Sequence, residues 1–179
     1  MNEMSKPATK SGATKSGATK SGNVHQYELA GFLPYQLSIA SNAVSDLIAE
    51  RYRKRFGLKV TEWRVMAVLG DAGIARGEGS GRLTQRDLTE ATLMDKVAVN
   101  RACKVLEERG LIARAANEQD GRSHLLELTV DGQAIHREVM PLAKATEREL
   151  FDGFSAEEEA ALRAMLQRLR ARVAALSRG

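Results

Sequence analysis

Hydrophobic positions recur every three or four residues over most of this chain, which is typical of amphipathic helices. The first apolar stripe predicts a helix over 34–55, and Gly57 is expected to end it. Its members are Leu33, Leu37, Ala40, Val44, Leu47 and Ile48. Thr61 predicts the N-cap of a second helix, which covers 62–69 and stops at Gly70.

Glycines and capping residues divide the next part of the chain. A glycine-rich loop is expected over 70–82. Thr84 and Asp87 have the spacing of a capping box and predict a short helix over 84–91. Asp95 then predicts the N-cap of a further helix over 95–109, so two short helices follow each other closely.

Two short strands and two long helices complete the pattern. Residues 111–114 and 125–129 predict a hairpin around a polar turn. Apolar periodicity then predicts helices over 130–150 and 155–176. The fold class is therefore mainly α with a small β-hairpin wing: a winged helix-turn-helix combined with a further helical region.

The composition limits what the chain can do. It has 179 residues, of which 43% are hydrophobic and 4% aromatic, so the core must come from Leu, Val, Ala and Met. Cys103 is the only cysteine, which excludes an intrachain disulfide and a cysteine-based zinc cluster. The sequence has no phosphate-binding loop, no catalytic serine motif and no paired His and carboxylate, so an enzyme, a metal or a cofactor is not expected. No membrane span or secretory signal is predicted, and the expected compartment is the cytoplasm.

The net charge of +4 is concentrated at the N-terminus, where four lysines and Glu3 lie within residues 1–26. Residues 8–22 repeat ATKSG three times, and residues 1–25 are expected to be a disordered basic tail. The tail is either an accidental expansion or a weak electrostatic arm for nucleic acid. The rest of the chain is nearly neutral, so DNA binding must depend on where its charges are placed.

The outward face of the predicted helix over 95–109 suits a DNA major groove. An arginine there can bond a guanine or a phosphate, an asparagine can bond an adenine, and small apolar groups can touch a thymine methyl. The expected contacts on this helix are Lys96, Val97, Ala98, Asn100, Arg101 and Lys104. The bracing helix and the wing are expected to add Thr84, Gln85, Arg86, Arg114, Arg122 and Ser123, with Asp120 directing the Arg122 side chain.

The order of these elements and several motifs resemble the MarR family of bacterial transcription regulators. The motifs include Leu83–Leu88, Met94–Arg101, Leu106–Leu111 and the wing signature Asp120-Gly121-Arg122-Ser123. The resemblance spans about residues 30–176. It implies a winged-helix DNA-binding domain over 59–129 and a dimerisation region formed by 26–58 and 130–179.

The resemblance also implies a function. Such proteins are homodimers that bind a palindromic double-stranded DNA operator, usually as repressors, and a small aromatic carboxylate, a phenol or a coenzyme A thioester releases them. By position in the family, Ser38, Asn42, Trp63 and Arg64 are the expected effector-binding residues. Two alternatives stay open: a winged helix that binds a protein partner, and a redox-sensing regulator that acts through Cys103.

Overall fold

The computed structural model describes residues 29–75, 77, 81–118 and 120–177. The predicted N-terminal tail and part of the predicted loop over 70–82 lie outside these residues. The chain divides into two compact units, one up to Ala40 and the other from Ser41 onwards. In the first unit, residues 33–40 form the first part of helix α2 (Leu33–Phe56), and the Gln36 side chain bonds the carbonyl oxygen of Ala30.

Helix α2 matches the predicted range, but the face that it buries is a different one. The residues of α2 that the chain buries are Ala49 and Tyr52. Leu33 and Leu37 at the start of the predicted apolar stripe are exposed, whereas Ile48 at its end packs against the core. The helix ends as predicted, because Gly57 has a φ of +62° and its N–H bonds the carbonyl oxygen of Arg53.

Helix α3 (Val60–Ala75) differs from the prediction at both ends. Thr61 lies inside the helix, and the Glu62 carboxylate accepts the hydrogen bond from the backbone N–H of Lys59. The helix also continues through Gly70. Gly70 is buried against the imidazole of His136, so a tertiary contact accounts for the missing side chain and the residue does not end the helix.

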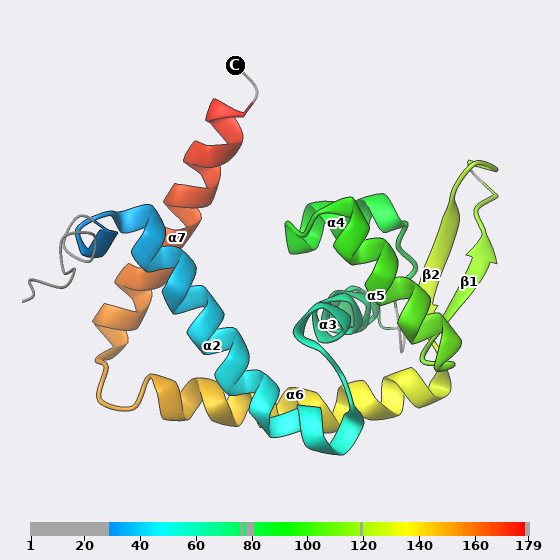
Figure 1. Cartoon of the computed structure of the whole chain (residues 1–179), viewed down its shortest axis with the longest axis horizontal. Helices are drawn as coiled ribbons and strands as arrows, with labels where there is room; N and C mark the ends of the chain where they lie inside the picture. The colour runs from blue at the N-terminus through cyan, green and yellow to red at the C-terminus, as the bar shows by residue number, and fades with distance from the viewer. Residues whose placement is uncertain (1–28, 76, 78–80, 119, 178–179) are drawn as a thin grey trace, which may run out of the picture. The chain divides into compact units, whose positions relative to one another are not determined.

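The predicted winged helix is confirmed between α3 and residue 128. Helices α4 (Gln85–Thr92) and α5 (Lys96–Glu108) are followed by the antiparallel strands β1 (Ile112–Ala116) and β2 (His124–Leu128). Figure 1 shows α3, α4, α5 and the hairpin grouped together, and contacts join α3 to both α4 and α5. Leu83 adds a short bridge to Leu126, which the sequence pattern did not predict.

Two long helices follow, as predicted. Helix α6 (Val130–Leu150) begins after the N-cap Thr129 and continues through Pro141. It packs against α3 and β2, while ion pairs join it to α2 through Arg51 and Glu149 at 2.6 Å and through Arg55 and Glu138. Helix α7 (Ala156–Leu176) begins with the predicted capping box of Ser155 and Glu158, and none of its residues is buried.

The core lies under the winged helix and reaches α2 and α6. Buried side chains come from helices α2 to α6 and from both strands, whereas α7 contributes none. The larger members include Tyr52, Leu58, Trp63, Met66, Leu69, Leu88, Leu106, Leu126 and Val139. This core holds α4, α5 and the hairpin in place from behind, so their polar residues face outward.

Candidate nucleic-acid interface

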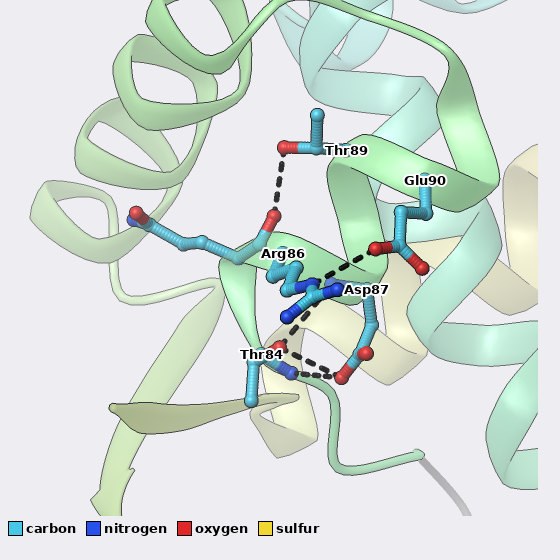
Figure 2. Close-up of polar contacts among 6 residues, drawn as sticks. Thr84, Arg86, Asp87, Thr89 and Glu90 are labelled. Carbon is cyan, nitrogen blue, oxygen red and sulfur yellow. Dashed lines mark hydrogen bonds and ion pairs between the residues drawn. The ribbon is translucent and has the colours of Figure 1, made fainter. Parts of the chain in front are cut away.

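The start of α4 is fixed by a complete capping box, shown in Figure 2. The Thr84 Oγ1 accepts a hydrogen bond from the backbone N–H of Asp87 at 3.2 Å. In return, the Asp87 carboxylate accepts from the backbone N–H of Thr84 at 2.8 Å. This box satisfies two backbone donors that the helix leaves unpaired. It therefore fixes the first turn of α4 and the direction in which the side chains of Gln85 and Arg86 project from it.

Helix α5 presents the outward face that the sequence predicted. Asp95 caps it by accepting from the backbone N–H of Ala98 at 2.8 Å. Its inner face is buried through Val99, Ala102, Cys103 and Leu106. The outer residues that are exposed are Lys96, Val97, Asn100, Arg101 and Lys104, whereas Ala98 is half-buried. Val97 is 57% exposed, so an apolar side chain stands among polar groups on this face.

The two helices also meet through polar side chains. The Gln85 amide on α4 donates to the Asn100 Oδ1 on α5 over a long 3.5 Å. This contact is weak, since hydrogen bonds lose strength quickly at such distances. It does bring the amide side chains of α4 and α5 side by side on the exposed surface.

The wing turn is held by hydrogen bonds among its own side chains and backbone. The Asn117 amide donates to the Ser123 Oγ at 2.8 Å, and the Ser123 N–H bonds the carbonyl oxygen of Asp120 at 2.9 Å. The Asp120 carboxylate accepts from the backbone N–H of Arg122 at 3.1 Å. Our expectation that Asp120 holds the Arg122 guanidinium is therefore wrong: the carboxylate shapes the turn and does not direct the side chain.

A cavity of about 440 Å³ lies between the start of α4 and the wing. It brings together all of the predicted DNA-contact residues outside α5. Its lining consists of Thr84, Gln85, Arg86, Arg114, Asn117, Asp120, Arg122, Ser123 and His124. Asn117 and His124 were not predicted, and only the pairing of the two strands identifies them as neighbours of the α4 N-terminus. The three arginines and the helix N-terminus make this recess suitable for phosphate oxygens.

Several cations of the predicted site already have carboxylate partners. Arg86 bonds Glu90 at 2.9 Å, an interaction that raises the pKa of Arg86 (Figure 2), and Lys104 lies 3.8 Å from Glu108. Arg114 donates to both oxygens of Glu107. These pairs are exposed to solvent, so each contributes little to stability and can be exchanged for a phosphate.

Three other cations of the site have no ion pair within the described part of the chain. They are Lys96, Arg101 and Arg122. Lys96 and Arg101 lie on the exposed face of α5, and Arg122 lies on the wing. Such cations bind DNA without first giving up an internal partner.

The four expected effector residues lie in different surroundings. Ser38 and Asn42 are exposed on α2. Trp63 is buried, with its ring centroid 5.6 Å from the rings of both Tyr52 and His136, so our expectation that it stacks on a ligand does not fit its place in the core. Arg64 donates to the Ser45 hydroxyl at 3.0 Å.

A larger cavity lies along α6, where the sequence did not predict one. Its volume is about 600 Å³, and its lining comprises Ile74, His136, Arg137, Met140, Pro141, Lys144, Glu147 and Arg148. Apolar side chains and three cations meet in it, which suits a small organic anion with an apolar body. His136 is buried, and its Nε2 atom has no hydrogen-bond partner among the described residues.

Comparison with known proteins gives a consistent result. The model of the MarR family matches residues 56–123. A probable transcriptional regulator from Pseudomonas aeruginosa is 29% identical, with a TM-score of 0.64 over 79% of this chain and 98% of that chain. Mutant MarR from E. coli complexed with operator DNA is 21% identical, with a TM-score of 0.67 over 83% and 99%. BpsR from Bordetella bronchiseptica, whose DNA binding is regulated by 6-hydroxynicotinic acid, is 23% identical, with a TM-score of 0.65 over 77% and 98%.

The element order and the exposed face of α5 define the class of the protein as a winged helix-turn-helix protein, the fold that it shares with these structures. Its winged-helix part, residues 56–123, matches the model of the MarR family. Among the described helices, none is long and apolar enough to cross a membrane.

Proposed function

We propose that the protein is a sequence-specific repressor that binds a palindromic operator as a homodimer and is released by a small ligand. The observation that carries this proposal is the surface formed by α5 and the recess beside the wing. Asn100 and Arg101 supply the groups that recognise bases, and Arg122 supplies an unpaired cation for the backbone or the minor groove. The DNA-binding domain would span 59–129, and the protein would act in the cytoplasm.

Exposed apolar side chains support the dimer. Helix α7 has no buried residue, yet it exposes Met165, Leu166, Leu169, Val173 and Leu176. The first described segment exposes Leu29, Phe32, Leu33, Leu37 and Ile39. Apolar surface of this extent is unfavourable in water, and a second copy of the chain would cover it. The dimerisation region would comprise 26–58 and 130–179.

A small aromatic carboxylate, a phenol or a coenzyme A thioester is the proposed effector class. The aromatic acid that regulates BpsR supports the carboxylate class. In this chain, the cations of the α6 cavity could pair with a carboxylate, and its apolar side chains could contact a ring. Asn42 and Arg64 stay candidate contacts on the α2 and α3 side.

The test is a fluorescence-anisotropy titration of the full chain on the DNA upstream of its own gene, at two salt concentrations. Saturable binding that resists excess unrelated DNA is expected, and hydroxycinnamic acids or their thioesters should weaken it. Asn100→Ala should change base preference at one position per half-site by about 1–3 kcal/mol. Equal weakening on every sequence would remove the base-reading role of Asn100.

A winged helix that binds a protein partner is the competing function. It would give no competitor-resistant DNA binding at either salt concentration, and Arg101→Ala and Arg122→Ala would leave the weak residual binding unchanged. The unpaired cations on α5 and the wing favour the operator-binding function, because a protein-binding winged helix does not need them.

A further inference from the structure

The side chain of Arg109 joins the ends of three helices. Arg109 directly follows α5 as its C-cap residue. Its Nη2 donates to the carbonyl oxygen of Phe56, the last residue of α2, at 2.6 Å. Its Nη1 donates to the carbonyl oxygen of Gly57 at 3.2 Å. Carbonyls at the end of a helix have no partner within the helix, and a cation there also interacts favourably with the helix dipole.

The third helix that Arg109 contacts is α3, through Glu62 in its first turn. Glu62 is 3% exposed, and its carboxylate accepts from the backbone N–H of Lys59 at 2.9 Å. The same carboxylate oxygen lies 3.7 Å from the Nη1 of Arg109. A buried carboxylate is costly without a partner, so Glu62 and Arg109 depend on each other. We call Arg109, Glu62 and the carbonyls of Phe56 and Gly57 the helix-end clasp.

The clasp connects two parts of the chain that have different proposed tasks. Helix α2 contributes to the proposed dimerisation region, and α5 carries the base-reading residues. Tyr52 and Ser45 of α2 contact α3 through Trp63 and Arg64. The clasp adds a direct connection from the end of α2 to the end of α5. A guanidinium suits this connection, because its planar donors bond two carbonyls at once.

We propose that Arg109 is a positioning residue for DNA binding: by fixing α5 to the end of α2, the clasp sets the half-site spacing that the dimer accepts. This inference rests on the proposed function. In a dimer that reads two half-sites about one helical turn apart, the spacing depends on how firmly each recognition helix is tied to the dimerisation helices. Loss of the clasp should loosen that spacing and leave the contacts within each half-site unchanged.

The first experiment uses the DNA upstream of the gene, after footprinting has located the two half-sites. Duplexes with one base pair inserted or deleted between the half-sites are compared with the native duplex and with a single half-site. We expect the wild type to lose about tenfold or more in affinity for the altered spacings, since a base pair rotates one half-site relative to the other. Arg109→Gln should bind the native duplex more weakly, lose less than about threefold for the altered spacings, and keep its affinity for the single half-site.

Three further variants separate positioning from folding. Glu62→Gln should make DNA affinity depend less on the half-site spacing, as Arg109→Gln does. Arg109→Lys should keep part of the spacing dependence, because one ammonium group can donate to only some of the acceptors that the guanidinium reaches. Arg53→Gln is the matched control on α2, since Arg53 forms an exposed ion pair with Asp46 at 3.4 Å and no contact of the clasp. Equal weakening of Arg109→Gln on all duplexes, with an unchanged spacing profile, would overturn the proposal and indicate a role in folding alone.

A second measurement tests the clasp without DNA. Spin labels at Lys104→Cys in the Cys103→Ser background report the distance between the two α5 helices of a dimer by pulsed EPR. Arg109→Gln should broaden this distance distribution, and Arg53→Gln should not. An unchanged distribution would overturn the inference. Failure of the wild type to bind DNA would instead overturn the proposed function, while the distance measurement would still test the clasp.

Discussion

Among single residues, Gly70 on α3 makes room for the imidazole of His136 on α6. A Cβ at position 70 would lie 2.3 Å from the His136 Nε2. Gly70→Ala should therefore destabilise the fold by about 1–3 kcal/mol, although alanine is the better helix former. Urea unfolding measures this change, and Gly121→Ala is the control because nothing lies within 4 Å of its Cβ position. The double variant Gly70→Ala/His136→Ala should recover part of the loss, and no recovery would contradict the contact.

His136 also predicts how stability depends on pH. Burial lowers the pKa of His136 below its usual 6.5, and Asp71 opposes this shift in part. The folded state thus binds a proton less readily than the unfolded state, so His136 stabilises the fold above about pH 6.5 and this contribution is lost as the pH falls below that value. Thermal unfolding between pH 5 and 8 should show the decline, and His136→Gln should reduce its slope.

Cys103 is a poor candidate for a redox switch. Burial raises the pKa of its thiol to about 11, which keeps the thiol protonated near neutral pH. We expect a disulfide reagent to label Cys103 slowly in the native protein and rapidly in guanidinium chloride. Peroxide should not change the DNA affinity of either the wild type or Cys103→Ser. Loss of binding in the wild type alone would restore the redox alternative.

Among the secondary-structure elements, the wing offers two arginines with different surroundings. Arg122 has no ion pair within the described residues, whereas Arg114 already bonds Glu107. Arg122→Ala should therefore weaken binding to all DNA sequences and lower the salt slope by about one, and Arg114→Ala should lower it less. Anisotropy titrations over a range of salt concentrations measure both slopes. A larger effect of Arg114→Ala would contradict this assignment.

The elements also show what local sequence signals predict. The capping boxes at Thr84 and Ser155 and the cap at Asp95 gave correct helix starts, because a cap is satisfied within three or four residues of chain. Gly70 misled the prediction, since its role is to admit His136, which lies far away in the sequence. A single glycine signals a helix end only where no neighbour requires the space.

The candidate site likewise has parts that the sequence predicts and parts that it does not. The outward face of α5 follows from helical periodicity, so its residues were predicted correctly, except that Ala98 is half-buried. The recess between α4 and the wing depends on strand pairing, and the clasp joins residues that are 53 positions apart. Neither leaves a periodic signal in the sequence. The burial of Trp63 was likewise decided by Tyr52 and His136 on other helices.

For the whole molecule, α7 provides the sharpest test of dimerisation. Leu169 is 45% exposed and Val173 is 55% exposed. Leu169→Glu/Val173→Glu would place charges on the proposed interface, where each buried charge is costly. We expect a monomer by light scattering and at least a tenfold loss of operator affinity, because two half-sites no longer bind together. Arg168→Glu, an exposed polar position on the same helix, is the control.

A stable dimer of the double variant would show that another surface joins the two chains. It would also leave the exposed apolar residues of α7 without an explanation. The winged helix should fold in either case, since its core does not use α7. Circular dichroism of the variant checks that point.

The absence of buried residues in α7 has a consequence for the lifetime of the protein in a cell. A helix of 21 residues that buries none of its side chains is marginal in water, so its order would depend on meeting a second chain. Newly made chains at low abundance would expose this segment to proteases, while chains at high abundance would protect one another. The protein would then be degraded fastest when it is scarce. Its steady-state level would therefore rise more than proportionally with its rate of synthesis.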